Sequence, residues 1–250
     1  MAKWKQTPKH IMRKSCLEYV IRGWEPSSFI EFGAGTGDFT AVFLDKGFKG
    51  VCYDIGAESR RILRESLSDY KDSLTVVDAL SEIGDKKFDY LFAFEVLEHI
   101  EDEMRALREW TAYLKPKGRV LISVPAHARK FGPDDEFHGH IRRYDKKALY
   151  DLLAGAGYKN IRIFNYGFPL GNLTRCFNSL FFKFLSKENK DALNMTAQER
   201  SIRSGVERCE KTVKLSFLFN RFFMFPFLIL QKLFFNADIS DGYVAYAEKG

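Results

Sequence analysis

Long apolar runs and paired cysteines are both missing from this sequence. The four cysteines stand at positions 16, 52, 176 and 209, form no Cys-x-x-Cys pair and have no histidines at metal-ligand spacing. The sequence therefore predicts neither a zinc site nor a disulfide framework, and no bound metal is expected. The same scarcity of paired cysteines predicts a reducing, cytoplasmic setting.

Apolar segments of membrane-spanning length are lacking as well. The basic start, Met-Ala-Lys-Trp-Lys-Gln, is not followed by an apolar run, so no signal peptide is expected. Within residues 215–235 the uninterrupted apolar stretch runs only from 222 to 230 and contains Pro226, whereas a span of the bilayer needs about 20 apolar residues. The 250 residues are predicted to form one large α/β core with an elaboration.

Positive charge is in excess, but only in one segment. The chain has a formal net charge of +6, and residues 170–235 hold eleven Lys and Arg against five Asp and Glu. The rest of the chain is therefore neutral. Residues 164–235 also contain fourteen of the 24 phenylalanines, so one segment carries both the charge bias and most of the aromatic excess.

A glycine-rich turn is the most informative motif. The residues Glu31-Phe-Gly-Ala-Gly-Thr-Gly-Asp38 follow an apolar strand-like run and precede apolar residues on a helical spacing. Glycines at 33, 35 and 37 permit positive φ and leave room for a ligand across the turn. A dinucleotide fingerprint would place its third glycine at position 38, where this sequence has aspartate.

Acidic residues follow the next two predicted strands. The run from Gly50 ends in Asp54, and the run from Leu74 ends in Asp78. In a doubly wound sheet the first of these positions lies beside the ribose of a bound nucleotide. A helix N-cap is the alternative for Asp54, and a turn is the alternative for Asp78. The apolar run 88–94 is expected to be a central strand buried on both faces.

Several of these motifs resemble those of one enzyme family. E-F-G-A-G-T-G resembles motif I of the class I S-adenosylmethionine-dependent methyltransferases, and E-V-L-E-H-I, starting at Glu95, resembles the segment after strand 4 in their ubiquinone/menaquinone-biosynthesis branch. The later run G-H-x-R-R-Y is similar to one found in one branch of the family. The resemblance covers about residues 29–166 and 242–248. It implies a doubly wound, Rossmann-like α/β sheet of seven strands, mostly parallel with an antiparallel strand 7.

The resemblance also implies a cofactor and its ligands. The cofactor is S-adenosylmethionine and the product S-adenosylhomocysteine. Asp54 is expected at the ribose, the Asp78 carboxylate at the adenine amino group and the Ala79 amide at a ring nitrogen. The acids at 31, 54 and 78 are predicted to converge on one adenosyl group. The full set of implied cofactor ligands is Glu31, Gly33, Ala34, Gly35, Gly37, Asp54, Ile55, Asp78, Ala79, Leu80, Phe94, Glu95 and His99.

A polar loop at 126–144 supplies candidates for chemistry. Imidazole titrates near neutrality, so the candidate general bases are His127, His138 and His140. The candidates for binding a carboxylate or phosphate on the methyl acceptor are Arg142, Arg143 and Tyr144. The alternative is that these cations are structural and pair with the acids at 134–136 of the same loop.

Three parts are predicted along the chain. Residues 1–28 form a helical cap, residues 29–169 with 239–250 form the cofactor-binding core, and residues 170–238 form a basic, Phe-rich helical insertion between strands 6 and 7. The insertion is interpreted as a peripheral contact with an anionic membrane or as a hood over a lipid-like acceptor. The alternative is a self-packed subdomain or a homodimer contact; RNA binding is a third interpretation.

The sequence thus predicts methyl transfer to oxygen or nitrogen of a small or lipid-linked acceptor. Enzymes that methylate nucleic-acid bases carry Asp/Asn-Pro-Pro-Tyr/Phe after strand 4, which is lacking here, so no nucleic-acid target is expected. One alternative function is an NAD(P)-dependent oxidoreductase, which Asp38 opposes. Another is a non-catalytic, membrane-associated module that binds S-adenosylmethionine.

Overall fold

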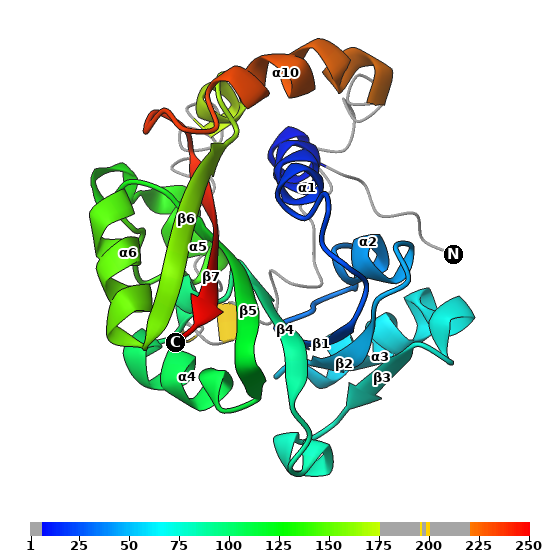
Figure 1. Cartoon of the computed structure of the whole chain (residues 1–250). Helices are drawn as coiled ribbons and strands as arrows, with labels where there is room; N and C mark the ends of the chain where they lie inside the picture. Colours follow the sequence, from blue (N-terminus) through cyan, green and yellow to red (C-terminus); the bar gives the residue numbers. More distant parts are fainter. Residues whose placement is uncertain (1–6, 176–195, 197–198, 201–220) are drawn as a thin grey trace. The chain divides into compact units, whose positions relative to one another are not determined.

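The computed structural model describes residues 7–175, 196, 199–200 and 221–250 (Figure 1). Seven strands form one sheet in the order β3-β2-β1-β4-β5-β7-β6. Neighbouring strands among β1 to β5 run parallel, and β7 is antiparallel, so the predicted fold class is confirmed. The strands are β1 Ser28–Phe32, β2 Lys49–Tyr53, β3 Leu74–Val77, β4 Phe88–Phe94, β5 Leu114–Pro125, β6 Tyr158–Tyr166 and β7 Gly242–Lys249.

The chain divides into two compact units. Unit 1 comprises residues 1–22, 125–146 and 163–244, and unit 2 comprises residues 23–124, 147–162 and 245–250. The domain boundaries predicted from the sequence stay a prediction, and much of the predicted insertion lies outside the described residues. The principal helices are α1 Pro8–Val20, α2 Thr40–Leu44, α3 Ala57–Ser66, α4 Glu103–Thr111, α5 Pro133–His138, α6 Lys146–Gly155 and α10 Arg221–Leu233.

In unit 2, helices cover both faces of strand β1. Phe29 packs against Phe43 of α2, with ring centroids 6.2 Å apart, whereas Phe32 stacks on Trp110 of α4 at 4.7 Å. These two strand residues are three apart, so their side chains point to opposite faces. A strand buried on both sides explains the continuous apolar run Tyr90–Phe94 of β4 and the apolar residues on both faces of β1.

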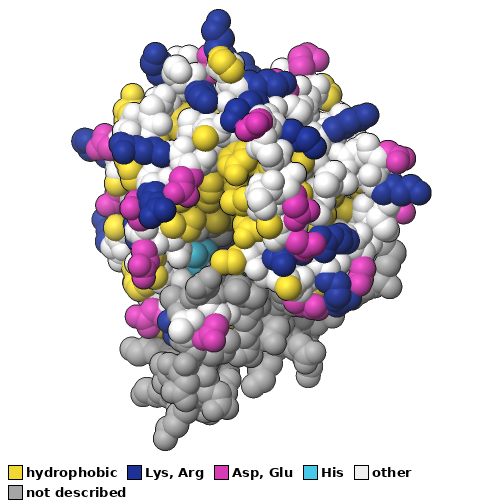
Figure 2. Space-filling view, turned by 90° about the horizontal axis from the view of Figure 1, so that it is seen from below, with side chains coloured by type: hydrophobic (Ala, Val, Ile, Leu, Met, Phe, Trp, Pro, Cys, Tyr) yellow, Lys and Arg dark blue, Asp and Glu magenta, His cyan; other side chains and the backbone are white. Residues whose placement is uncertain are grey.

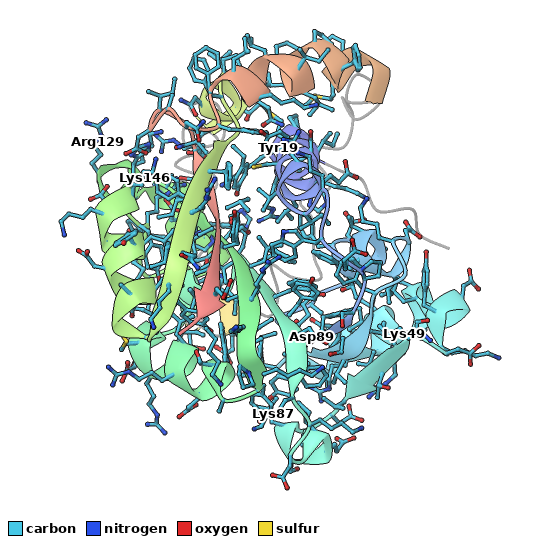
Figure 3. All side chains as sticks on the ribbon, viewed as in Figure 1. Tyr19, Lys49, Lys87, Asp89, Arg129 and Lys146 are labelled. Carbon is cyan, nitrogen blue, oxygen red and sulfur yellow. The ribbon has the colours of Figure 1, made fainter. Side chains whose placement is uncertain are left out.

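The start of β4 is fixed by a charged anchor. Asp89 accepts hydrogen bonds from the Ser27 and Ser28 hydroxyls at 2.6 and 2.5 Å and forms an ion pair with Lys115 at 2.9 Å (Figure 3). Burial raises the pKa of Asp89, but these hydrogen bonds and the Lys115 charge outweigh it and hold the pKa well below its usual range. The carboxylate therefore joins the first residues of β1, β4 and β5.

In unit 1, helix α10 packs against α1. Gln231 of α10 donates from Nε2 to the Met12 carbonyl at 3.1 Å, and its Oε1 accepts from the Gly167 amide at 3.3 Å. Met224 of α10 is fully buried. Both polar atoms of a buried glutamine are thus satisfied, which fixes α10 on α1. Among the residues described, no helix is both long enough and apolar enough to span a bilayer.

Two elements differ from the sequence prediction. A strand was expected over 119–124, but β5 begins at Leu114, which pairs with Phe88 ahead of a register shift. The irregularity accommodates Pro116, because a bulge tolerates a residue without an amide proton. The segment 126–144 was expected to be a loop, but it contains α5, which starts at Pro133 and ends at Gly139 in the left-handed conformation.

The surface carries charges of both signs. On the face shown in Figure 2, Lys and Arg side chains lie among Asp and Glu side chains, with hydrophobic side chains gathered between them. This mixture of charges is that of an ordinary solvated surface.

Candidate functional site

The predicted cofactor residues of unit 2 follow one row of the sheet. Phe32 of β1 pairs with Tyr53 of β2 and with Ala93 of β4, and Tyr53 pairs with Val77 of β3. The residues one step beyond this row are Gly33, Phe94, Asp54 and Asp78. The structure therefore brings these four predicted residues to the same carboxyl edge, where doubly wound sheets bind their ligands.

The three glycines of the turn have different surroundings. All have positive φ, at +67° for Gly33, +56° for Gly35 and +84° for Gly37. A Cβ at Gly33 would lie 2.5 Å from Val96, and one at Gly37 would lie 2.5 Å from Leu63. A Cβ at Gly35 would meet no described atom within 4 Å. Gly33 and Gly37 are thus required by packing, and Gly35 is the glycine that leaves space for a ligand.

Gly35→Ala is expected to weaken S-adenosylmethionine binding at least about 10-fold, because its methyl group enters the space left for the ligand. The unfolding free energy should fall by about 1–2 kcal/mol from the positive φ alone. Gly157→Ala is the matched control, since Gly157 also has positive φ and a Cβ added there would meet no described atom within 4 Å. Titration calorimetry and thermal unfolding measure both effects; equal cofactor affinity in the two variants would contradict the role given to Gly35.

Asp54 supports the turn directly. Its Oδ2 accepts from the Gly35 amide at 2.9 Å and its Oδ1 accepts from the Gly56 amide at 2.8 Å. The side chain is buried. Each carboxylate oxygen has two lone pairs, so Asp54 retains capacity to accept from a ligand hydroxyl.

Glu31 is held on the α2 face of β1. Its Oε2 accepts from the Thr40 hydroxyl at 2.7 Å and lies 3.8 Å from the Cys52 thiol. The side chain is only 2% exposed, and burial raises the pKa of Glu31 to about 7. Contact of this carboxylate with a ligand stays a prediction. In the structure the buried Glu31 side chain joins β1 to α2 through Thr40.

The buried Glu31 carboxyl should make stability depend on pH. The unfolded chain ionises this group near 4.5 and the folded chain near 7, so stability falls as pH rises between these values and is constant above them. Glu31→Gln is expected to be more stable relative to wild type at about pH 8 than at about pH 5, by about 2–3 kcal/mol. Denaturant unfolding at both pH values tests this, and a pH-independent difference would contradict it.

Asp78 and Ala79 already have protein partners. Arg60 and Arg64 both reach the Asp78 carboxylate at 2.8 Å, and Glu82 accepts from the Ala79 amide at 2.7 Å. These hydrogen bonds to Arg64 and Arg60 lower the pKa of Asp78. The adenine contacts of Asp78 and Ala79 therefore stay predictions. To bind adenine, the Ala79 amide would have to break its hydrogen bond to Glu82 and donate to a ring nitrogen instead. Asp54 and Asp78 lie at this edge, whereas Glu31 lies inside β1, paired with Cys52. The carboxylates of the three acids are bound to three different sets of groups.

A strained residue follows strand β4 directly. Glu95 has φ of +56°, which is rare for a residue with a side chain, and its Oε1 accepts from the Ser123 hydroxyl at 3.2 Å. His99 lies in the short helical turn that follows. Backbone strain such as that at Glu95 is common at ligand sites.

Two further predicted cofactor residues are apolar. Ile55, which follows Asp54, is exposed, and Leu80, which follows Ala79, is half-buried.

In unit 1, the predicted loop is tied together at its base. The His127 amide donates to the Tyr144 carbonyl at 2.7 Å, and the Tyr144 amide donates to the Pro125 carbonyl at 3.0 Å. His127 is buried, with φ of +61° and Nε2 3.7 Å from Asp238. Burial, helped by the Lys130 charge, lowers the pKa of His127. Its imidazole is therefore neutral at pH near 7, the form in which it can accept a proton.

Arg143 holds a buried charge cluster. Its Nε donates to both oxygens of Asp135, at 2.9 and 2.8 Å, and its Nη1 donates to Asp241 at 3.1 Å. His140 contacts the same Asp135 through Nδ1 at 2.8 Å. Burial raises the pKa of Asp135, but the His140 and Arg143 hydrogen bonds outweigh it and keep the carboxyl ionised. Arg143 thus pairs with an acid of the same loop, as the structural alternative predicted. Acceptor binding by Arg142 and Tyr144 stays a prediction, as does catalysis by His138 and His140.

The residues at the carboxyl edge fit an adenosyl group. Gly35 leaves open space, Ile55 offers an exposed apolar side chain after Asp54, and the buried Thr36 hydroxyl has no hydrogen-bond partner among the described residues. A buried hydroxyl without a partner is costly unless a ligand or water satisfies it. Thr36, Arg60, Arg64 and Glu82 were not predicted from the sequence, because the spacing of hydroxyl and charged side chains does not distinguish them from ordinary surface residues.

Comparisons with known proteins agree with this arrangement. Residues 8–163 match the family model described as a methyltransferase domain. Over 137 residues the chain is 29% identical to phosphoethanolamine N-methyltransferase 1 of Triticum aestivum, covering 52% of this chain and 27% of that protein. Over 104 residues it is 33% identical to the ubiquinone/menaquinone biosynthesis C-methyltransferase UbiE of Hahella chejuensis, covering 38% of this chain and 42% of that protein. The chain thus spans less than half of either relative.

A solved structure supports the fold. Phosphoethanolamine N-methyltransferase 2 of Haemonchus contortus, in complex with S-adenosyl-L-methionine, superposes with a TM-score of 0.55 at 19% identity, covering 93% of this chain and 51% of that one. The family match extends over more than half of the 250 residues and includes the glycine turn, Asp54 and the end of β4. The chain therefore belongs to the methyltransferase domain family.

Proposed function

We propose that this protein binds S-adenosylmethionine at the carboxyl edge of unit 2 and transfers its methyl group to oxygen or nitrogen of a small or lipid-linked acceptor. The observation that carries the proposal is the Asp54 carboxylate, which follows β2 and is bound to the amide of the open glycine of the turn. Relatives of this chain are named as N- and C-methyltransferases, which supports the reaction class.

The chain's own residues would bind and position S-adenosylmethionine and would accept a proton from the methyl acceptor. Bound S-adenosylmethionine supplies an electrophilic methyl group on sulfur. Asp54 and the turn amides would fix the adenosyl group. The candidate general bases for the proton that the acceptor loses are the predicted histidines His127, His138 and His140, of which His127 has a lowered pKa. Positioning of reactants contributes several kcal/mol in such displacements, and a placed base contributes about 10²–10⁴ in rate.

Incubation with S-adenosylmethionine labelled in the methyl group tests the proposal. Phosphoethanolamine, a demethylated quinol and total lipid extract serve as candidate acceptors, with mass spectrometry of the products. Label transferred by wild type and lost in Asp54→Asn is the expected result. Tight cofactor binding without transfer to any of these acceptors would instead favour a non-catalytic binding module.

We also infer that α10 contacts an anionic membrane surface. Phe225, Ile229 and Leu233 are spaced four apart on one face of α10 and are 61%, 49% and 76% exposed. By contrast, Met224 is buried and Gln231 is bound to Met12 of α1. Exposed apolar groups of this kind favour insertion at the interface. Residues 170–235 carry six more basic than acidic side chains, since eleven minus five is six, and each cation near an anionic surface adds about 1 kcal/mol.

Flotation with vesicles tests this contact. Wild type is expected to float with phosphatidylglycerol-containing vesicles and less with phosphatidylcholine alone, and Phe225→Ser/Ile229→Ser/Leu233→Ser should abolish flotation. Tyr150→Ser/Leu173→Ser is the matched control, because these side chains are also exposed and lie outside α10. If the α10 variant instead converts a dimer to a monomer and wild type does not float, a second copy of the chain covers this face and the membrane proposal is wrong.

A further inference from the structure

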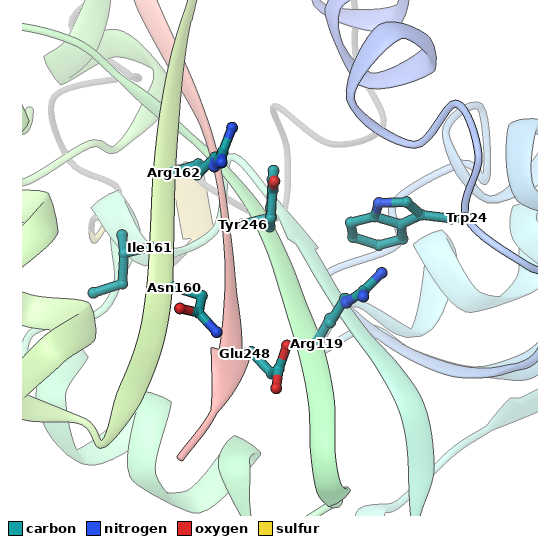
Figure 4. Close-up of a pocket in the computed structure, with 7 residues that line it drawn as sticks. All are labelled: Trp24, Arg119, Asn160, Ile161, Arg162, Tyr246 and Glu248. Atoms are coloured by element: carbon teal, nitrogen blue, oxygen red, sulfur yellow. The ribbon is translucent and has the colours of Figure 1, made fainter.

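Unit 2 contains a hollow that the cofactor residues do not line. Its volume is about 340 Å³, and its lining includes Trp24, Arg119, Asn160, Arg162, Tyr246 and Glu248 (Figure 4). These side chains come from β5, β6, β7 and the segment before β1. The volume is at the small end of the range for ligand pockets, about 300–1,000 Å³, so the hollow suits a small molecule.

An aromatic stack holds Arg119 in this hollow. The guanidinium lies 5.5 Å from the centre of the Trp24 ring (Figure 4). Trp24 in turn stacks on Tyr90 at 5.0 Å and meets Tyr246 edge-on at 5.8 Å. The indole thus contacts both aromatic rings and the cation. The stack positions the guanidinium without using any of its five N–H donors.

The two arginines of the hollow differ from the others in unit 2. The remaining arginines of this unit, at 60, 61, 64, 105 and 108, each donate a side-chain hydrogen bond to a carboxylate or a carbonyl. Within the described residues, Arg119 and Arg162 form neither a hydrogen bond nor an ion pair, and Glu248 forms neither with them. Two guanidinium groups with available donors therefore line one concave space.

The lining charges define the class of ligand. Two guanidinium groups and one carboxylate give the hollow a net positive charge, and a guanidinium binds a carboxylate or phosphate through two parallel hydrogen bonds. Glu248 can only accept when ionised, so it favours a ligand with a hydroxyl or ammonium group beside the anion. We propose that this hollow is a second binding site for a small phosphate monoester or carboxylate that carries such a donor.

Titration calorimetry with glycerol 3-phosphate and with inorganic phosphate, at constant ionic strength, tests the site. Saturable binding of one molecule is expected, with glycerol 3-phosphate bound more tightly. Arg119→Gln and Arg162→Gln should each weaken binding at least about 10-fold, the loss of one charge-assisted contact. Glu248→Ala should strengthen binding of inorganic phosphate and remove the preference for the ester. The titrations are repeated with saturating S-adenosylmethionine to exclude binding at the cofactor residues.

Arg108→Gln is the matched control, because it removes the same charge from unit 2 outside the hollow. Unchanged binding in this variant is expected, and a loss equal to that of Arg162→Gln would show that the anion responds only to overall charge and would overturn the proposal. Absence of saturable binding by wild type would overturn it too. Arg162 has no hydrogen-bond partner among the residues that the structure describes, so the thermal unfolding midpoint of Arg162→Gln should match wild type and exclude misfolding as a cause.

Discussion

Asp54→Asn is expected to weaken S-adenosylmethionine binding by about 100-fold or more. The ionised carboxylate would accept from ribose hydroxyls while it holds the Gly35 and Gly56 amides, and each hydrogen bond to a charged group is worth about 1.5–3 kcal/mol. The amide of asparagine cannot accept at both positions. Titration calorimetry measures the loss, with catalytic turnover of the proposed reaction as a second readout.

Asp72→Asn serves as the control for Asp54→Asn. Asp72 is exposed and precedes β3, away from the strand ends of the candidate site, so cofactor affinity should not change. Circular dichroism of both variants checks that the fold is intact. If the cofactor affinity of Asp54→Asn were within about a factor of two of wild type, the predicted contact between Asp54 and the ribose would be wrong.

Arg143→Met is expected to destabilise the protein by about 3–5 kcal/mol, because it leaves buried carboxylates without their shared cation. Asp135 and Asp241 are each about 1% exposed. Arg143→Lys should lose less, since it keeps the charge but not the bidentate geometry. Denaturant unfolding measures all three proteins. The double variant Arg143→Met/Asp135→Leu should recover part of the loss, because both members of the buried pair are then apolar.

Arg129→Met is the control for the buried cluster, since Arg129 is exposed in the same unit (Figure 3). Its unfolding free energy should stay within about 0.5 kcal/mol of wild type. If Arg143→Met were equally mild, the Arg143 cluster would not stabilise unit 1 and the loop could not depend on it for its shape.

The parts of the site that the sequence predicts are those fixed by backbone geometry. Glycines at 33, 35 and 37 all have positive φ, and Asp54 and Asp78 both follow the same row of the sheet. A strand followed by a glycine turn, and acids at strand ends, leave signals that survive without knowledge of tertiary contacts. The antiparallel direction of β7 was implied by the family resemblance and is confirmed.

The parts that could not be predicted depend on which side chains meet. Arg60 and Arg64 reach Asp78 from α3, and Glu82 reaches the Ala79 amide from the following turn. Each is a long charged side chain whose partner is set by the fold rather than by spacing. Helix α5 did carry local signals, a proline at its start and Gly139 after its end, but the abundance of polar residues around them favoured a loop.

A crystal structure of the protein with S-adenosylhomocysteine tests the central claim most directly. The account predicts the ribose hydroxyls within hydrogen-bond distance of the Asp54 carboxylate, with the nucleoside across Gly35. A nucleoside bound elsewhere in the chain, or at the turn but turned away from Asp54, would contradict it.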